Sequence, residues 1–421
     1  MSDVARALDV WCFEEKAGKL TEAGGGTLSF TYDPAWIAAD LPPLSFSLPL
    51  SGAYDSNAVE AFFGGLLPEG DIRELVAGEF GISSDNAFSL LDAIGGDCAG
   101  AVSLYRQDAP PAEHVPGVDW LTEPELDELL AALPRCPMVT ADGEGYRLSL
   151  AGAQDKFPAV IEDGRIGLPR GRQPSTHIVK APISWLPDTV PNEAFCLAVG
   201  RRLGIHCAEA LPRLVGSSPV LIVTRYDRVT GEDGRTRRLH QEDFCQALGI
   251  PSANKYESEG GPSLVDCAEL VRAVSTDAVG DLLGLIDCWA LSFLVGNHDA
   301  HGKNYSILYG PGSARLAPAY DIISSISYLA VAKVDKKMAM KVGGSRKPDW
   351  LNRDHLDAFL GQARLGKAPT RRRLHDLASR APGAVEEVRD EFIAEGWWSK
   401  TLDRVVQTFA ARSRKLTELC E

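Results

Sequence analysis

The chain has 421 residues and a formal net charge of −15. Because a single hydrophobic core stops growing beyond roughly 250 to 300 residues, this length predicts two or three domains. Hydrophobic residues make up 45% and charged residues 24%, which excludes a disordered or collagen-like chain. The negative charge opposes direct binding to a nucleic-acid backbone, so any role on DNA is expected to act through a partner.

The apolar segments and the cysteines indicate the cellular location of the protein. The longest apolar stretches, 220–223 and 282–294, are short or interrupted by Asp287, whereas a membrane-spanning helix needs about 20 apolar residues. The N-terminus lacks the basic start and apolar run of a signal peptide. Nine cysteines are scattered without a C-x-x-C pair, which is typical of reduced cysteines. We therefore expect a cytoplasmic protein without a membrane anchor.

The first unit is expected over residues 1–108. Alternating stretches at 8–13 and 27–32 predict strands, and 57–67 predicts a helix. The segment 108–117 predicts a linker, because proline opposes both helix interiors and central strands and three prolines occur within it.

Residues 109–228 form the second predicted unit, a small lobe rich in strands. Strands are predicted at 146–150, 157–161, 165–168 and 176–180, with Asp163-Gly164 as a hairpin turn. An amphipathic helix at 192–203 follows, and then strands at 207–215 and 220–226.

The third predicted unit, 229–421, is largely helical. One helical face is marked by apolar residues three and four positions apart, namely Leu282, Leu285, Ile286, Trp289 and Phe293. This helix is expected to end at Gly296. A polar loop at 297–304 then leads to strands at 305–309 and 314–318.

The densest polar cluster is that loop, which reads His-Asp-Ala-His-Gly-Lys-Asn from residue 298 to residue 304. Phosphoryl transfer needs a carboxylate that accepts the hydroxyl proton and oxygen ligands for Mg²⁺. Asp299 and Asn304 have the spacing of the protein-kinase catalytic loop, H-R-D-x-x-x-x-N. Asp321 offers a second carboxylate for the metal. The alternative is that Asp299 caps a turn and Asp321 starts a helix.

Two upstream segments could complete a nucleotide site. The phosphate-loop segment, Ser-Leu-Ala-Gly-Ala-Gln-Asp-Lys at 149–156, has small residues that let backbone N–H groups approach phosphates, although an ordinary hairpin connection has the same composition. Lys180 ends a strand, as the phosphate-pairing lysine of kinases does, and Glu193 is its candidate partner. The hinge segment, Thr224 to Asp227, follows the apolar strand at the lobe junction, where backbone groups could hold adenine.

Together these segments resemble the HipA family. The stretches that carry the resemblance are LSLAGAQDK, THIVK, TRYDR, HQEDFCQALGIPSANKYESEGGPS, HDAHGKN and AYDIISS, and residues 67–104 resemble the HipA N-terminal domain. The likeness extends to about residue 330. It implies an α+β, two-lobed protein-kinase-like fold with a β-rich N-terminal subdomain and a largely helical C-terminal lobe.

The resemblance also implies roles for residues. Asp299 would be the proton acceptor, and Asn304 and Asp321 would bind Mg²⁺. ATP would be contacted by Ala151, Gly152, Ala153, Gln154, Asp155, Lys156, Lys180, Thr224, Arg225, Tyr226, His301, Lys303, Asn304, Tyr320 and Asp321. Ser149 lies at the place of a serine whose autophosphorylation ejects the loop, and the physics agrees, because phosphoserine adds a charge of about −1.5 to −2 that repels ATP phosphates.

The implied function is a serine/threonine protein kinase toxin. Its partners would be a protein substrate and a HipB-like helix-turn-helix antitoxin, with DNA bound only through that antitoxin. The chain departs from the family pattern at Thr224, which replaces an acidic hinge residue, and beyond Ser345, where the likeness is weaker. A basic island there, Lys367, Arg371, Arg372 and Arg373, is typical of a solvated helix start.

Two other functions stay open. A metal-dependent phosphohydrolase could use His298, Asp299 and His301, but it would need more histidine ligands, and His177 and His240 lack the surrounding helices. A pseudokinase could act only as a transcriptional co-repressor. The presence of Asp299, Asn304, Asp321 and Lys180 argues against it.

Overall fold

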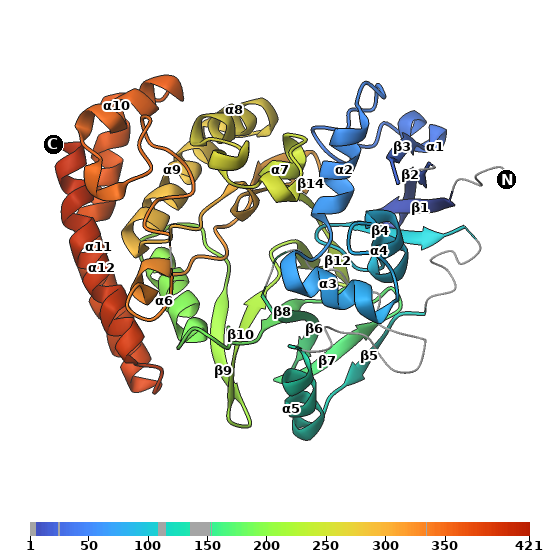
Figure 1. Cartoon of the computed structure of the whole chain (residues 1–421), viewed down its shortest axis with the longest axis horizontal. Coiled ribbons are helices and arrows are strands. Elements are labelled where there is room, and N and C mark those ends of the chain that lie inside the picture. The colour runs from blue at the N-terminus through green and yellow to red at the C-terminus, as the bar shows by residue number, and fades with distance from the viewer. Residues whose placement is uncertain (1–5, 24–25, 108–114, 135–151, 153, 334) are drawn as a thin grey trace.

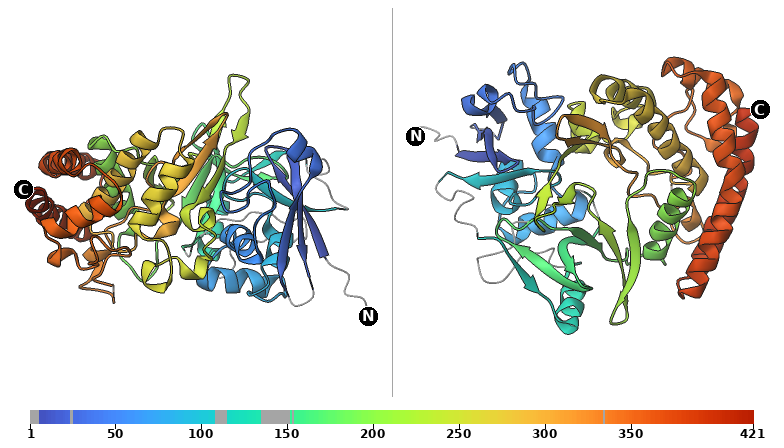
Figure 2. Two further views of the ribbon diagram at one scale, coloured as in Figure 1. Left: turned by 90° about the horizontal axis from the view of Figure 1, so that it is seen from above. Right: turned by 180° about the vertical axis from the view of Figure 1, so that it is seen from behind.

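Three hydrophobic cores divide the chain in the computed structural model, which describes residues 6–23, 26–107, 115–134, 152, 154–333 and 335–421. The first core belongs to the N-terminal residues and the second to a six-stranded sheet, while the third and largest joins the C-terminal helices to the helix at 189–202. The N-terminal sheet and the long C-terminal helices lie at opposite ends of the molecule (Figures 1 and 2).

The N-terminal subdomain is an antiparallel sheet covered by short helices. Its strands have the order β3-β2-β1-β4, with β1 at Arg6–Cys12, β2 at Glu15–Glu22, β3 at Leu28–Tyr32 and β4 at Val102–Arg106. The helices are α1 (Pro34–Ala38), α2 (Ser56–Gly65), α3 (Gly70–Glu79) and α4 (Ala87–Ile94). The predicted strands at 8–13 and 27–32 and the helix at 57–67 are confirmed. Strand β2 was not predicted, because its sequence EKAGKLTE has few apolar residues.

The second unit is built on a six-stranded sheet of order β5-β7-β6-β8-β10-β9. Its strands are β5 (Gly117–Trp120), β6 (Lys156–Glu162), β7 (Arg165–Arg170), β8 (His177–Lys180), β9 (Ala210–Val215) and β10 (Ser218–Thr224). Helix α5 (Glu123–Ala132) was not predicted, and α6 (Thr189–Arg202) was. The prediction that the linker 108–117 includes Gly117 is wrong, because Gly117 begins strand β5 and pairs with Arg170 in the sheet. The predicted strand 146–150 lies outside the described residues.

Residues 228–243 correct the prediction that the chain turns helical after 229. They form strands β11 (Arg228–Thr230), β12 (Thr236–Arg238) and β13 (His240–Asp243). Strand β13 pairs with β14 (Ser306–Gly310), which also pairs with β15 (Ser313–Leu316). The register aligns Asp243 with Ser306, and so brings Asp243 next to the polar loop at 297–304. Strand β13 gave no alternating signal, since its buried positions are His240, Glu242 and Asp243.

The C-terminal lobe consists of α7 (Phe244–Ala247), α8 (Leu264–Val274), α9 (Ala278–Val295), α10 (Arg353–Gln362), α11 (Lys367–Ala394) and α12 (Lys400–Cys420). Helices α11 and α12 run side by side at one end (Figure 1). In the described part of the chain, α9 is the one helix long and apolar enough to cross a membrane, but it is largely buried and contacts α8, α11 and α12. The basic island starts α11, where Arg371 pairs with Asp357 and Arg373 with Asp287.

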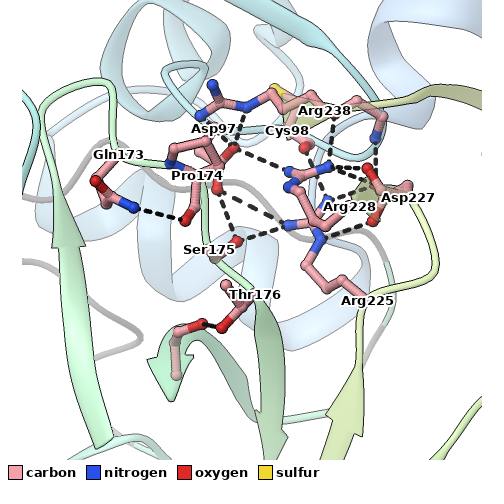
Figure 3. A network of polar contacts seen from close by, with 12 residues as sticks. Asp97, Cys98, Gln173, Pro174, Ser175, Thr176, Arg225, Asp227, Arg228 and Arg238 are labelled. Atoms are coloured by element: carbon pink, nitrogen blue, oxygen red, sulfur yellow. Dashed lines mark hydrogen bonds and ion pairs between the residues drawn. The ribbon is translucent and has the colours of Figure 1, made fainter. Parts of the chain in front are cut away.

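A buried ionic cluster joins the N-terminal subdomain to the hinge segment (Figure 3). Asp97 follows α4 and accepts hydrogen bonds from Arg238 (2.9 Å), Arg228 (3.2 Å) and Ser175 Oγ (2.9 Å). Asp227 of the hinge pairs with Arg225 (2.7 Å) and Arg228 (2.9 Å) and accepts from the Gly100 N–H. Because each buried carboxylate needs its guanidinium partners, this cluster fixes the hinge relative to the subdomain.

We predict that Asp97→Asn destabilises the protein by about 3–5 kcal/mol at pH 7, because it removes one of the two buried carboxylates that compensate three clustered arginines. Burial opposes the charge of Asp97, but Arg238, Arg228 and Arg225 lower its pKa to about 2. The contribution of ionised Asp97 to the free energy of unfolding is therefore complete above the pKa of aspartate in the unfolded chain, about 3.9. It is lost as the pH falls towards 2. Urea unfolding of both proteins should show the difference shrinking between pH 4 and pH 2.

The control is Asp92→Asn, which removes a carboxylate that pairs with the solvent-exposed Arg106. A surface pair contributes about 0–1 kcal/mol, so this variant should stay close to the wild type. Equal destabilisation by the two variants would contradict the role given to the cluster.

Candidate functional site

A cavity of about 830 Å³ lies where the three units meet. Its lining includes Glu69 of the N-terminal subdomain, Lys156, Lys180 and Tyr226 of the second unit, and Asp299 of the C-terminal lobe. This volume is within the range of clefts that hold small molecules and cofactors. The cavity contains most of the residues that the sequence analysis singled out.

Lys180 is the central cation of the site. It lies at the end of β8, and its Nζ is 2.7 Å from Glu193 Oε1 on α6 and 2.7 Å from Asp321 Oδ1, which follows β15. The Lys180–Glu193 ion pair predicted from the sequence is therefore formed. The Lys180 ammonium holds the pKa of Asp321 well below its usual range, so the carboxylate is ionised at neutral pH.

Asp321 does not start a helix. Its φ is +59°, in the left-handed region that non-glycine residues rarely adopt. This backbone turn accompanies a carboxylate that faces both Lys180 and Asn304, whose Nδ2 donates to Asp321 Oδ2 (3.1 Å). Asn304 Oδ1 in turn accepts from the His301 N–H (3.1 Å). The two predicted Mg²⁺ ligands are thus in direct contact.

Asp299 lies in the same cavity, in the loop that follows α9. Its N–H donates to Asn297 Oδ1 (3.0 Å), and its Oδ1 accepts from the Tyr256 hydroxyl (2.6 Å). Burial raises the pKa of Asp299, while the Tyr256 hydrogen bond opposes that rise. A carboxylate whose pKa is raised is a stronger proton acceptor, so Asp299 is suited to act as a general base.

The phosphate-loop segment is described only in part, because Ser149, Ala151 and Ala153 lie outside the described residues. Gly152 has a φ of +107°, a conformation that glycine tolerates and other residues do not. Gln154 and Lys156 line the cavity, and the Asp155 carbonyl accepts from the Ala181 N–H (2.9 Å). Burial, followed by the nearby Lys180, lowers the pKa of Lys156 to about 8.

The hinge segment reaches the cavity with some of its groups already engaged. The N–H groups of Thr224 and Arg225 donate to the carbonyls of Glu209 and Thr176. The Arg225 side chain is turned into the Asp97 cluster (Figure 3). The Tyr226 ring packs at 5.7 Å from the Tyr320 ring. The Arg225 and Asp227 side chains are therefore held by the cluster, while the Tyr226 and Tyr320 rings line the cavity.

His301, Lys303 and Tyr320 complete the set of predicted residues, and all three line the cavity. Lys303 Nζ lies 3.0 Å from Asp243 and 3.3 Å from Glu69. The Tyr320 hydroxyl donates to the Lys303 carbonyl (2.6 Å). The His301 ring contacts the Tyr256 ring edge-on at 5.0 Å.

The cavity lining also includes residues that were given no role in the sequence analysis, among them Glu69, Asp243, Lys255 and Tyr256. Three of these four lie in the stretch 240–263 that carried the family resemblance, and that clustering of polar residues is a usable signal. Glu69 is different. It lies more than 180 residues from the lysines that it contacts, so no local pattern could have paired them.

The donor set fits a magnesium-bound nucleotide. Mg²⁺ prefers hard oxygen ligands, and Asp321 with Asn304 provides an ionised carboxylate beside an amide. A histidine-based metal site is not formed: in the described ranges, no group of three or more His, Cys, Asp or Glu could hold a metal. His298 Nδ1 bonds to the Asp335 carbonyl (3.0 Å), and His240 Nε2 to the Leu44 carbonyl (2.6 Å).

The fold and the site define a two-lobed α+β protein of the protein-kinase-like class. The sequence model of the HipA N-terminal domain matches residues 8–105, and that of the HipA-like C-terminal domain matches residues 148–388. The chain belongs to the HipA family. The match extends well past residue 330, where the likeness recognised in the sequence ended.

Individual relatives agree with this membership. The chain is 42% identical over 393 residues to Y4mE of Sinorhizobium fredii, which is named as a kinase, covering 92% of both chains. It is 30% identical over 384 residues to the serine/threonine-protein kinase toxin HipA of Shewanella oneidensis, covering 87% of this chain and 85% of the relative. A solved complex of Shewanella oneidensis HipA, HipB and operator DNA matches with a TM-score of 0.81 and 26% identity, covering 98% and 96% of the chains.

We predict that Lys156 reacts with an amine-acylating reagent at pH 8 before Lys180 and Lys303 do. A substantial fraction of its amine is neutral at that pH, whereas their carboxylate partners raise the pKa of Lys180 and of Lys303 above the usual value. Peptide mapping by mass spectrometry measures the order of labelling. ATP with Mg²⁺ should protect Lys156, and labelling of Lys180 first would contradict the assignment.

Proposed function

We propose that this protein is a serine/threonine protein kinase toxin that transfers the γ-phosphate of ATP to a protein hydroxyl. The observation that carries the proposal is the convergence of Lys180, Asn304 and Asp321 in one cavity that also contains Asp299. Kinase activity is supported for the family by the names of its relatives. The specificity for ATP and for serine or threonine belongs to the proposal.

Each residue has a role that follows from its chemistry. Asp321 and Asn304 would bind Mg²⁺, which neutralises charge on the ATP phosphates when it is bound. Lys180 and Lys156 would bind phosphate oxygens, and the Glu193 carboxylate keeps the Lys180 ammonium in place. Asp299 would accept the proton of the substrate hydroxyl as the new oxygen–phosphorus bond forms and the bond to ADP breaks.

The toxin role and the partners follow from the relatives. The Shewanella oneidensis protein is named as a toxin, and its solved complex contains HipB and operator DNA. We propose a HipB-like helix-turn-helix antitoxin for this chain. The net charge of −15 favours contact with DNA through that partner. A translation factor such as an aminoacyl-tRNA synthetase, in the cytoplasm, is the proposed target by family analogy.

The test is incubation with labelled ATP and Mg²⁺. Asp299→Asn should lose self-labelling by roughly 10²- to 10⁴-fold, because a positioned general base contributes a factor of that size. Ser149→Ala should sharply reduce self-labelling, since Ser149 is the proposed autophosphorylation site. The matched control is Asp354→Asn, an exposed residue in the first turn of α10, which should label like the wild type.

The same assay separates the rival functions. Undiminished labelling in Asp299→Asn would remove Asp299 as the base. Nucleotide binding without any transfer would favour a pseudokinase that acts only as a co-repressor. Hydrolysis of phosphoesters with Mn²⁺ and no transfer from ATP would favour a phosphohydrolase.

Tyr256→Phe should move the acid limb of the pH profile of kcat/KM to higher pH. The Tyr256 hydroxyl stabilises the ionised form of Asp299, so its removal raises the pKa of the free enzyme's base further. Asp299 would then become protonated, and so inactive as a base, at a higher pH than in the wild type. Tyr54→Phe, which removes a hydroxyl within the N-terminal subdomain, is the control. An unshifted acid limb would show that Tyr256 does not influence the base.

A further inference from the structure

Glu69 places a carboxylate of the N-terminal subdomain inside the nucleotide cavity. Its side chain is 14% exposed, with Oε2 at 2.7 Å from Lys255 Nζ and Oε1 at 3.3 Å from Lys303 Nζ. Both lysines belong to the C-terminal lobe and line the same cavity. One carboxylate thus bridges two cations that are 48 residues apart in the sequence.

The local sequence gives no reason for a glutamate at this position. Glu69 is the N-cap residue of α3, where Ser, Thr, Asp or Asn are preferred because their short side chains accept hydrogen bonds from the first turn. Glu69 makes no such bond. Its carboxylate leaves its own helix uncapped and is directed to Lys255 and Lys303 instead, which indicates a tertiary role.

The backbone of the same residue contacts Gly152 of the phosphate-loop segment. The Glu69 N–H donates to the Gly152 carbonyl (3.2 Å), and Pro68 forms a parallel β-bridge with Gly152. This contact fixes the glycine whose φ of +107° shapes the segment just before Lys156. Residues 68 and 69 therefore connect Gly152 to Lys303 of the polar loop at 297–304.

The charges around Lys303 show why Glu69 matters. Burial disfavours the Lys303 ammonium, but Asp243 and Glu69 raise its pKa above the usual value. Lys255 depends on Glu69 more strongly, because Glu69 is its ion-pair partner among the residues that the structure describes. Lys255 also precedes Tyr256, the residue that donates to Asp299. Without Glu69, both lysines would lose part of what holds them at the cavity wall.

We propose that Glu69 is a positioning residue of the nucleotide site: through its ion pairs with Lys255 and Lys303 and its backbone bond to Gly152, it holds two cations and a glycine of the cavity wall in the arrangement that ATP requires. The N-terminal subdomain then contributes a residue on which nucleotide binding depends. This inference rests on the proposed function in that ATP is taken as the ligand.

The experiment is calorimetric titration of the full chain with ATP and Mg²⁺. Glu69→Gln should raise the Kd for ATP about tenfold, on the order of one charge-assisted hydrogen bond. Glu74→Gln is the matched control, because Glu74 is exposed on the same helix and undergoes the same change of charge. It should keep the wild-type Kd. Thermal unfolding without nucleotide identifies any loss of folding.

A double-mutant cycle distinguishes positioning from a general structural effect. Lys255→Met should also raise the Kd, and the double variant should bind no more than about twofold more weakly than the weaker single variant, because both changes break one ion pair. Wild-type affinity in Glu69→Gln, or effects that multiply, would overturn the proposal. If Glu69→Gln does not fold, the test uses Lys255→Met, a change at a partly exposed lysine. An unchanged Kd for ATP in that variant overturns the proposal.

Binding and transfer are separate readouts. A wild-type protein that binds ATP but phosphorylates no acceptor would refute the proposed kinase function and leave the cycle on Glu69 valid. A wild-type protein that does not bind ATP would refute both.

Discussion

The site depends on the Lys180 ammonium and its two carboxylate partners. Lys180 ends a strand of the second unit, Glu193 lies on α6, and Asp321 follows the β14–β15 hairpin of the C-terminal lobe. The Lys180 and Glu193 side chains are buried, where each charge is unfavourable without the other, whereas the Asp321 side chain is half exposed. The three elements therefore hold one another in place, and Asp321 stays ionised beside Asn304. Loss of Glu193 would leave the buried Lys180 ammonium with Asp321 as its remaining carboxylate partner, and loss of Lys180 would leave the buried Glu193 carboxylate without its cation.

The N-terminal subdomain is attached to the rest of the protein largely by buried polar contacts. Asp97 pairs with the arginines around the hinge segment, and Glu69 pairs with Lys255 and with Lys303 of the polar loop at 297–304. A third contact joins Ser45 and the Phe46 N–H to Glu242 of β13. Directional contacts of this kind specify orientation more strictly than apolar packing does, because misaligned buried charges are costly. The subdomain is thereby oriented towards the hinge and the cavity alike.

Local sequence signals predicted the elements whose cores are apolar and periodic. Helix α9, strands β6, β7 and β10, and the hairpin β14–β15 were all predicted, because they are apolar runs bounded by turn residues or, in α9, apolar residues at helical spacing. Strand β13 was not predicted, because its buried residues His240, Glu242 and Asp243 are polar and form no hydrophobic pattern. Their burial is made possible by partners elsewhere in the chain, such as Leu44, Ser45 and Lys303. Polar strands of this type are recognisable only once those partners are known.

The sequence by itself determined the family, and it predicted Asp299 and Asn304 as site residues, because the two lie close in the chain at the spacing of the kinase catalytic loop. The Lys180–Glu193 pair could also be predicted, since the two residues are only 13 positions apart. Only the tertiary structure decided that Arg225 faces a buried cluster, that Tyr256 contacts Asp299 and that Glu69 joins Lys255 and Lys303. These contacts connect residues up to 234 positions apart. Periodicity and spacing report only on neighbours in the chain, whereas the pairing of distant charges follows from how the three units pack.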